Sequence, residues 1–407
     1  MKKLFTWSAA LIAALLLAGC GGGSSPGAPA NVSVAVHDSS ALVSWNMETG
    51  VEYWVWSQAG TNITEQSCVS SLACTIKRGA TSPYLIAGLT NDASYAVFVN
   101  GTSKGSPVGA SSPTINFVPR VAGAVWSVGK PLGTVSLLGL GFTPATATRA
   151  STFVTAGVGG SIFSSADALT WTARTSNVAT NLNAVAYGDG KFIVGGDLGV
   201  ILTSPDAITW TAVNSGTTNA LYAFVVNGSV ITAVGANGTI LSSGDGTSWM
   251  TQVSGVTADL RGITLGNGIY VAVGAKGMLL TSANGANWQL IAPPTLLDLK
   301  SVAFGNGTFV AVGASGTLVT STDGVNWTAR PPIAANSLAA VVYGSQFVAV
   351  GSGGGIFTST DGIAWKAAAS GTTNDLNAVV FSASLTATLL QVGYAAVGAA
   401  GTNLTAY

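Results

Sequence analysis

The chain has 407 residues, which is enough for two domains. Charged residues make up only 7% of it and the formal net charge is zero, so it lacks the basic surface by which proteins bind nucleic acid or anionic membranes. Apart from the N-terminus, its apolar runs stop after about five or six residues, which is too short for a bilayer-spanning helix. Glycine is abundant, at 53 residues, and this favours an all-β protein with many tight turns.

The N-terminal segment predicts export. Two lysines precede an apolar stretch from Leu4 to Leu17 and then small residues, which is the pattern of a secretory signal peptide over residues 1–20. The segment Leu17–Cys20 resembles the lipobox of bacterial lipoproteins. That resemblance implies that Cys20 becomes the first mature residue and carries acyl chains, which anchor the protein to a membrane. An ordinary cleaved signal with an incidental cysteine is the alternative.

The residues after the lipobox indicate the membrane to which the protein is delivered. Gly21 stands where the lipoprotein signal for retention in the inner membrane has Asp. The resemblance therefore implies a lipid-anchored protein of the cell envelope, in the outer membrane of an organism that has one. Residues 21–28 are rich in Gly and Ser and are expected to form a flexible tether.

Two further cysteines remain, Cys68 and Cys74. Because export places them in an oxidising compartment, the pair predicts a disulfide. A metal or redox pair is the alternative, but it would need a nearby His or further Cys, which the sequence lacks. No metal or cofactor is expected.

Residues 29–118 predict a first domain of short strands. β-branched and aromatic runs alternate with turn residues, and the first strands are expected at 31–34, 41–45 and 53–56. We expect Trp45 to lie in the core.

The segment 88–99 of this domain resembles the fibronectin type III signature. Leu89, a turn, Tyr95 and an alternating strand follow one another in it. The resemblance implies an immunoglobulin-like β-sandwich, in which Tyr95 is the tyrosine corner and its hydroxyl bonds the backbone near the strand entry. Such domains are usually spacers or adhesive modules.

The remainder, residues 119–407, is a repeat. Six tryptophans are separated by 39, 39, 39, 39 and 38 residues, and they are Trp171, Trp210, Trp249, Trp288, Trp327 and Trp365. A fixed period near 40 residues predicts a β-propeller with one four-stranded blade per repeat. We expect each indole to fill the gap between neighbouring blades.

One repeat shows the expected blade. Strands are predicted at 299–304, 308–313 and 317–321, and a fourth from Trp327 onward. The hairpin Gly305-Asn306-Gly307 requires positive φ angles.

Seven repeats are counted from the glycine that precedes the third strand: Gly157, Gly195, Gly235, Gly274, Gly313, Gly351 and Gly398. The last repeat ends at Tyr407 without its tryptophan strand. We expect the segment Ala124–Val128 to supply that strand and so to close a seven-bladed ring; six or eight blades are the alternatives.

The turns before the tryptophans resemble the Asp-box (BNR) repeats of sialidases and of propellers like the photosystem II assembly factor. They are Ser165–Trp171, Ser204–Trp210, Ser243–Trp249, Ser282–Trp288, Ser321–Trp327 and Ser359–Trp365. Asn284 replaces the Asp in the fourth, and each is one residue shorter than the usual box. The resemblance implies a propeller fold and leaves its activity open, because many activities share this fold.

The residue types argue against an enzyme. The propeller contains no His, Glu or Cys, whereas glycosidases need a carboxyl pair or, in sialidases, a tyrosine nucleophile with an arginine clamp. A catalytic interpretation would require Asp259 and Asp298 to converge. Arg174 and Arg330 are predicted to be solvated strand ends on separate blades, and His37 an exposed residue of the first domain.

Comparison of the repeats points to one binding surface. The residue after each first-strand Leu varies in type: Leu138, Asn183, Tyr222, Arg261, Lys300, Ala339 and Asn377. These positions are predicted to ring the channel mouth, on the face that carries the loops between blades. The candidate ligand mouth consists of Asn183, Tyr222, Arg261, Lys300 and Asn377, with Asp197, Asn237 and Lys276 in the turns beside it. Its alternative is a set of solvent-facing strand starts.

The predicted function is therefore a surface-tethered, non-catalytic binding or scaffolding lipoprotein that engages a protein or glycan. Arg261 and Lys300 would receive a polar or anionic group and Tyr222 would offer a stacking face. The alternatives are a carbohydrate-active protein, lectin-like or related to glycosidases, and an assembly factor for an envelope complex.

Overall fold

The structure, a computed structural model, describes residues 25–71, 74–103, 108–146, 149–386 and 389–406. The signal segment and Cys20 lie outside these ranges. The chain divides into two compact units: residues up to 121 together with 385–390, and residues 122–384 together with 391–407. Each unit has hydrophobic clusters of its own. Within the described ranges, no helix is both long enough and apolar enough to cross a membrane.

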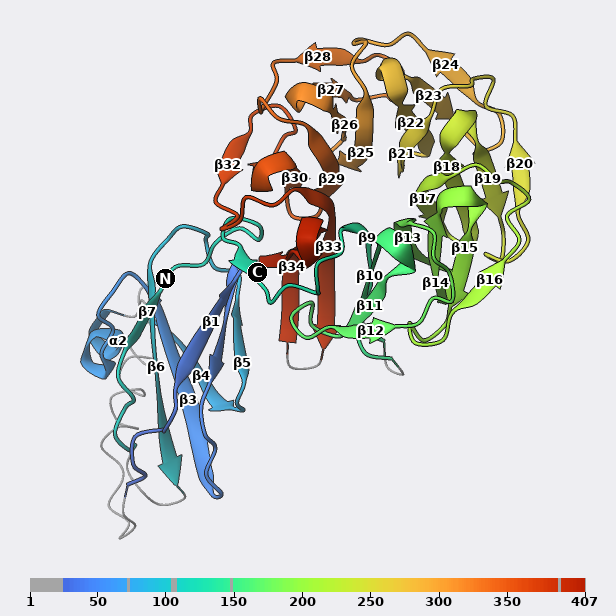
Figure 1. Cartoon of the computed structure of the whole chain (residues 1–407). Helices are drawn as coiled ribbons and strands as arrows, with labels where there is room; N and C mark the ends of the chain where they lie inside the picture. The colour runs from blue at the N-terminus through green and yellow to red at the C-terminus, as the bar shows by residue number, and fades with distance from the viewer. Residues whose placement is uncertain (1–24, 72–73, 104–107, 147–148, 387–388, 407) are drawn as a thin grey trace. The chain divides into compact units, whose positions relative to one another are not determined.

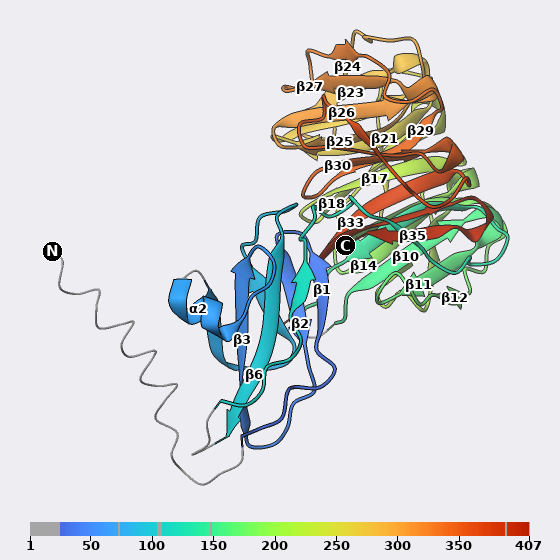
Figure 2. The same cartoon turned by 90° about the vertical axis from the view of Figure 1, so that its left-hand side faces the viewer.

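The first unit contains two antiparallel sheets (Figure 2). The three-stranded sheet has the order β1-β2-β5, with β1 Ser33–His37, β2 Ser40–Ser44 and β5 Tyr84–Ala87. The four-stranded sheet has the order β4-β3-β6-β7, with β3 Val51–Ala59, β4 Thr75–Ala80, β6 Tyr95–Ser103 and β7 Ile115–Phe117. Both sheets contribute to one core that includes Trp45, as expected. The first strand begins two residues later than predicted, because Asn31 has a φ of 54° and lies in a turn.

Tyr95 makes the contact expected of it. Its hydroxyl accepts a hydrogen bond of 2.9 Å from the backbone N–H of Thr90, and its ring stacks on Phe117 with the centroids 5.9 Å apart. The contact ties the turn before β6 to the strand itself.

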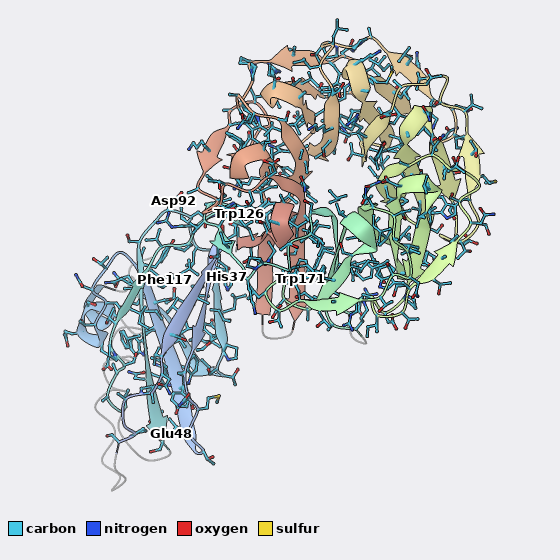
Figure 3. All side chains as sticks on the ribbon, viewed as in Figure 1. His37, Glu48, Asp92, Phe117, Trp126 and Trp171 are labelled. Carbon is cyan, nitrogen blue, oxygen red and sulfur yellow. A yellow bond between two sulfur atoms is a disulfide. The ribbon has the colours of Figure 1, made fainter. Side chains whose placement is uncertain are left out.

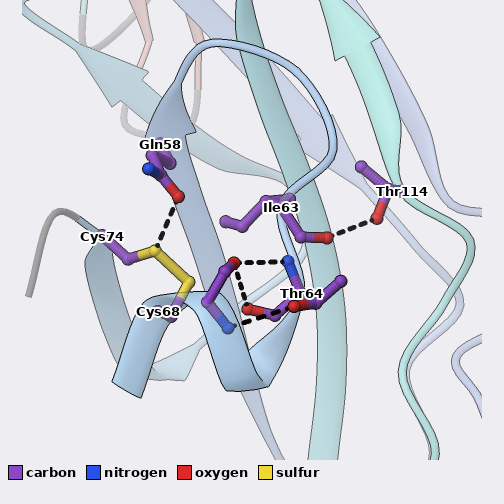
Figure 4. The surroundings of a disulfide bond; sticks show 7 residues. Gln58, Ile63, Thr64, Cys68, Cys74 and Thr114 are labelled. Carbon is purple, nitrogen blue, oxygen red and sulfur yellow. Dashed lines mark hydrogen bonds between the residues drawn. A yellow bond between two sulfur atoms is a disulfide. The ribbon is translucent and has the colours of Figure 1, made fainter. Parts of the chain in front are cut away.

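The disulfide between Cys68 and Cys74 is present and lies beside a short helix, α2 (Glu65–Ser71), that the sequence did not predict (Figure 4). Thr64 and Ser67 exchange hydrogen bonds across its first turn, with Ser67 N–H donating to Thr64 Oγ1 at 3.1 Å. This reciprocal cap and the burial of Cys68 against Trp56 and Phe98 form the helix in a stretch without a helical pattern.

Replacing both Cys68 and Cys74 with Ala should lower the free energy of unfolding by about 2 kcal/mol, because the bridge closes a short loop and restrains the unfolded chain only modestly. Urea unfolding of the oxidised protein and of the double variant measures this. A reductant should destabilise the wild type and leave the variant unchanged; equal midpoints for oxidised and reduced wild type would contradict the prediction.

His37, which is labelled in Figure 3, is predicted from the sequence to be exposed. Its exposed fraction is instead 8%. It ends β1, and the turn that follows it is held by Asn91, whose Nδ2 donates to Asp38 Oδ1 at 2.7 Å. Within the described chain neither ring nitrogen has a hydrogen-bond partner. Burial lowers the pKa of His37 and so favours the neutral ring.

The second unit is a ring of four-stranded antiparallel sheets (Figure 1). The described residues form seven such blades, as predicted. In chain order their strands are β9 (Leu137–Thr143), β10 (Thr152–Gly157), β11 (Ile162–Ser165) and β12 (Thr172–Arg174); β13 (Leu182–Gly188), β14 (Lys191–Gly196), β15 (Ile201–Ser204) and β16 (Thr211–Val213); β17 (Leu221–Asn227), β18 (Val230–Gly235), β19 (Ile240–Ser243) and β20 (Met250–Gln252); β21 (Leu260–Gly266), β22 (Ile269–Gly274), β23 (Leu279–Ser282) and β24 (Gln289–Ile291); β25 (Leu299–Gly305), β26 (Thr308–Gly313), β27 (Leu318–Ser321) and β28 (Thr328–Arg330); β29 (Leu338–Tyr343), β30 (Phe347–Gly351), β31 (Ile356–Ser359) and β32 (Lys366–Ala368); and β33 (Leu376–Thr386), β34 (Leu389–Gly398), β35 (Asn403–Ala406) and β8 (Ser127–Val128).

A 3-10 turn joins the second and third strands of every blade. These turns are η1 (Val158–Gly160), η2 (Asp197–Gly199), η3 (Ala236–Gly238), η4 (Ala275–Gly277), η5 (Ala314–Gly316), η6 (Ser352–Gly354) and η7 (Ala399–Gly401). The second blade corrects the repeat count by one residue, because η2 follows Gly196 and not Gly195. Two consecutive glycines make this register ambiguous in the sequence.

The fifth blade shows how local sequence makes the sheet. The hairpin between β25 and β26 has positive φ at Asn306 (46°) and Gly307 (74°), as the turn type requires. β26 has the predicted bounds. β27 starts one residue late because η5 occupies the chain up to Gly316. Trp327 ends the box turn immediately before β28, so it does not lie on the fourth strand as predicted.

The two ends of the propeller close the ring, as predicted. β8 pairs with β35 in antiparallel register, with Val128 opposite Leu404. The residue before β8, Trp126, is 8% exposed and donates from Nε1 to the carbonyl of Gly123 at 2.8 Å. Trp327 makes the same bond to the carbonyl three residues before it. Trp126 is therefore the seventh member of the tryptophan series, brought to the last blade from the start of the domain.

The box turns are held by their acidic residue. Asp323 Oδ1 accepts the N–H groups of Val325 and Asn326 at 2.9 and 2.7 Å. In the fourth box, Asn284 Oδ1 accepts two N–H groups in the same way at 3.0 and 2.9 Å. An amide oxygen thus substitutes for the carboxylate in this turn. These hydrogen bonds, first that from Asn326, hold the pKa of Asp323 well below its usual range.

The replacement Asp323→Asn should leave the fold intact and weaken the loss of stability in acid. The folded-state pKa of Asp323 is depressed, so its stabilising contribution is present above the unfolded pKa of about 3.9 and is lost as pH falls toward the folded value. An asparagine cannot titrate. Urea unfolding at about pH 7 and about pH 3 gives the loss in free energy of unfolding with acid for the wild type and for the variant. An equal loss in the two proteins would refute the prediction.

The repeat tryptophans are less buried than predicted. Trp210 is 6% exposed, but the other five repeat indoles are half-buried. In the fifth blade, Trp327 lies 6.2 Å from the Phe309 ring and covers its own box turn. Between the fifth and sixth blades the buried cluster consists mainly of residues of the first and second strands, and Val310 and Phe347 of the second strands are fully buried in it.

Candidate binding mouth of the propeller

Seven residues, one from each blade, line one cavity of about 200 Å³ at the channel mouth. They are the predicted set: Leu138, Asn183, Tyr222, Arg261, Lys300, Ala339 and Asn377. All are half-buried. The structure therefore brings together the five first-strand residues proposed for ligand binding, along with two apolar ones.

A β-bulge directs these side chains. In the fourth blade Leu260 pairs with Gly274 and Gly262 with Val273, so Arg261 is an extra residue without a partner in the ladder. The same shift occurs at Asn183, Tyr222 and Lys300. Bulges re-aim side chains near binding sites, and in these four blades the bulge directs the variable residue toward the cavity.

Two of the five predicted side chains bind neighbouring blades. Asn183 Nδ2 donates to the carbonyl of Leu221 at 3.3 Å and to Asp197 Oδ1 at 2.8 Å. Asn377 Nδ2 donates to the carbonyl of Leu137 at 2.8 Å. Their amides connect adjacent blades around the ring, so these two side chains are already engaged within the propeller.

Arg261 lies between two carboxylates. Its Nη2 is 3.6 Å from Asp259 Oδ2 and 4.0 Å from Asp298 Oδ2. Each carboxylate also accepts the N–H of a turn residue on the preceding blade, Asn237 for Asp259 at 3.1 Å and Lys276 for Asp298 at 2.9 Å. The two aspartates that a catalytic interpretation would need thus converge on Arg261 and accept hydrogen bonds from turns.

Tyr222 and Lys300 are the free polar groups of the mouth. Over the part of the chain that the structure describes, neither the Tyr222 hydroxyl nor the Lys300 ammonium has a hydrogen-bond or ion-pair partner. Both also line a cavity of about 210 Å³ together with Leu138, Asn183 and Arg261. Burial, followed by the charge of Asp259, raises the pKa of Tyr222, which keeps its hydroxyl protonated.

The three predicted turn residues lie on the same face and outside this cavity. Asp197 accepts hydrogen bonds from Asn181 and Asn183 at 3.0 and 2.8 Å. Asn237 Nδ2 donates to Asn219 at 3.1 Å, and Lys276 is exposed. The position equivalent to Asn237 and Lys276 in the second blade is Leu198, since all three have positive φ.

The outer arginines do not form a clamp. Arg174 Nε donates to Ser164 Oγ at 2.8 Å, and Arg330 Nε to Thr320 Oγ1 at 2.9 Å, each within its own blade. No group of three or more His, Cys, Asp or Glu side chains suited to a metal occurs in the described ranges.

Comparisons with known proteins agree on the propeller. A family model described as the DUF6242 beta propeller domain matches residues 252–377. No curated protein matches the sequence. The solved structure of YCF48 bound to D1 peptide is similar with a TM-score of 0.56 and 16% identity, over 69% of this chain and 94% of that chain. YCF48 from Cyanidioschyzon merolae gives 0.55 and 17%, over 70% and 99%.

The WD40 beta propeller domain of Doa1 is also similar, with a TM-score of 0.53 and 11% identity, over 69% of this chain and 95% of that chain. The second unit is a β-propeller. At these identities the likeness establishes the fold alone.

Proposed function

We propose that this protein is a non-catalytic binding module whose propeller engages a segment of a partner protein at the channel mouth. The observation that carries the proposal is one cavity beside Arg261 that contains Tyr222 and Lys300, two polar groups without a partner among the residues that the structure describes. Both side chains are half-buried and therefore reach the solvent of the mouth, where polar groups of a ligand can replace water as their hydrogen-bond partners. One similar propeller is YCF48 in a peptide complex, which supports a peptide as the ligand.

The same geometry disfavours catalysis. The cavity contains no free carboxyl group, because Asp259 and Asp298 flank Arg261 and cap turns. Of the side chains that serve as general acids or bases, the described lining of the cavity offers only Tyr222 and Lys300. The mouth offers a hydrogen-bond donor, an ammonium group and a ring face, which are suited to recognition.

We further propose that the first unit is an immunoglobulin-like, fibronectin type III domain that serves as a spacer. The sheet orders β1-β2-β5 and β4-β3-β6-β7 and the Tyr95 hydrogen bond support it. The lipobox ending at Cys20 supports attachment to the cell envelope by acyl chains. The module would then present its propeller away from a membrane.

The proposal is tested by panning a phage library of random 12-residue peptides against the mature protein. We expect enriched peptides whose affinity falls at least about tenfold with Lys300→Ala. The control is Lys366→Ala, an exposed cation on the outer strand β32, which should bind like the wild type. Enrichment of no peptide, or equal loss with both variants, would refute the proposal.

A further inference from the structure

The loops that join consecutive blades fall into two kinds. Six of them have seven residues: 175–181, 214–220, 253–259, 292–298, 331–337 and 369–375. In four, the second residue is a serine whose hydroxyl bonds the carbonyl two residues on, at 3.0 to 3.2 Å. In the loops 292–298 and 331–337 that position is Pro293 and Pro332. Proline fixes φ and offers no N–H, so these two loops are rigid and present little polar backbone.

The proline loops also replace polar side chains with apolar ones. In loop 292–298, Leu296 and Leu297 are 81% and 45% exposed. The residues equivalent to Leu297 in two other loops are Asn219 and Asn374, whose amides bond threonine hydroxyls at 2.8 Å. Two exposed leucines therefore stand where the repeat elsewhere has Thr, Ala or Asn.

The neighbouring loops extend this apolar area. Val253, in the loop before the fourth blade, is 82% exposed. Loop 331–337 and the turn η6 enclose a pocket of about 290 Å³ that is lined by Ile333, Ala334 and Phe357. We name the loops 253–259, 292–298 and 331–337, with this pocket, the apolar loop sector. It lies on the face of the mouth, since Ile333 N–H bonds the carbonyl of Gly316 in η5.

The cations of the mouth all lie beside this sector. Arg261 and Lys276 belong to the fourth blade and Lys300 to the fifth, and they exceed their neighbouring carboxylates, Asp259 and Asp298, by one charge. Across the channel, Asp197 and Asp375 stand in the second and seventh blades, whose mouth and turn positions carry no Lys or Arg. The face therefore carries its net positive charge on the side of the apolar loop sector and its net negative charge on the opposite side.

We propose that the apolar loop sector docks a linear segment of the partner protein in which an acidic residue is flanked by large apolar side chains. This inference rests on the proposed function and names the chemistry of its ligand. The acidic residue would meet Lys300 at the mouth, and the apolar side chains would cover Leu296 and enter the pocket at Ile333. Rigid loops lose little entropy on binding, which favours affinity.

A second copy of the chain fits this surface poorly. In a two-fold dimer the sector would face itself, and Arg261, Lys276 and Lys300 would meet the same cations of the other copy. A sugar fits less well than a peptide, because glycan sites combine aromatic rings with planar polar groups, whereas the sector offers leucine, isoleucine and proline beside the single ring of Phe357. Charge and apolar character together select an acidic, apolar peptide.

The test uses synthetic copies of the peptides enriched by the library. We expect them to share an Asp or Glu near Leu, Ile, Phe or Trp, and Leu296→Ser and Leu296→Glu to weaken their binding at least about tenfold. Both substitutions change a largely exposed side chain, so we expect the variants to fold like the wild type. The matched control is Leu198→Glu, which alters a residue 68% exposed in η2 on the opposite side of the same face and should leave affinity unchanged.

The outcomes separate the two proposals. If Lys300→Ala abolishes binding and both Leu296 variants bind like the wild type, the mouth binds peptides and the sector has no part in it. If no peptide is enriched, the proposed function itself fails. If sedimentation shows a dimer that Leu296→Glu dissociates, the sector is occupied by a second copy and the peptide inference is overturned.

Discussion

Replacing Trp126 with Ala should lower the free energy of unfolding by about 3–5 kcal/mol, the cost of removing a large aromatic side chain from a packed core. Trp126 packs with Tyr394, whose ring centroid is 6.4 Å away, and with buried residues of the last two blades. It precedes β8, which supplies the fourth strand of the seventh blade and joins the ends of the propeller. Because a ring of blades is stabilised by each neighbour contact, loss of this indole should loosen the closure itself.

The control for this prediction is Trp327→Ala. Trp327 has the same Nε1 hydrogen bond but is half-buried and lies within a continuous blade, so we expect less than half the loss. Urea unfolding followed by the remaining tryptophan fluorescence measures both. Hydrogen exchange should show faster opening of β35 in the Trp126 variant alone. Equal destabilisation by the two substitutions would mean that closure depends no more on Trp126 than on any repeat indole.

The features that the sequence predicted correctly are local or periodic. A hairpin such as Asn306-Gly307 is determined by adjacent residues with positive φ. The 39-residue period is equally local, because each repeat forms one blade. Closure through β8 was also predictable, because the last repeat lacks a strand and an unassigned strand precedes the first. The number of blades followed from the seven repeats, and the identity of the closing segment followed from the strand that the last repeat lacks.

What escaped prediction depends on contacts between distant residues. The pairing of Arg261 with Asp298 joins two successive blades, and the burial of His37 cannot be seen in the residue pattern around it. The seven mouth positions were found because they vary where their neighbours are uniform. Which of them are free could not be found that way, since Asn183 is engaged by a carbonyl of the next blade. The bulge that directs these side chains leaves no signal in hydrophobic alternation.

Replacing Gly316 with Ala should lower the free energy of unfolding by about 3–5 kcal/mol. This is the sum of the cost of placing a Cβ on a left-handed backbone and the cost of a steric clash. Gly316 ends η5 with a φ of 68°, and a Cβ there would stand 1.9 Å from the carbonyl oxygen of Ala334. The obstruction is backbone, so the loop 331–337 would have to move. We expect the variant to lose peptide affinity as well, because this loop forms part of the apolar loop sector.

Gly307→Ala separates the two causes. Gly307 has nearly the same φ, 74°, but a Cβ there meets nothing within 4 Å, so its replacement should cost only the conformational penalty of about 1 kcal/mol. The difference between the two variants in urea unfolding then measures the clash with Ala334. Equal losses would show that loop 331–337 moves away from the new Cβ at no cost in free energy. In that case the sector would not be rigid, and its affinity could not come from pre-organised loops.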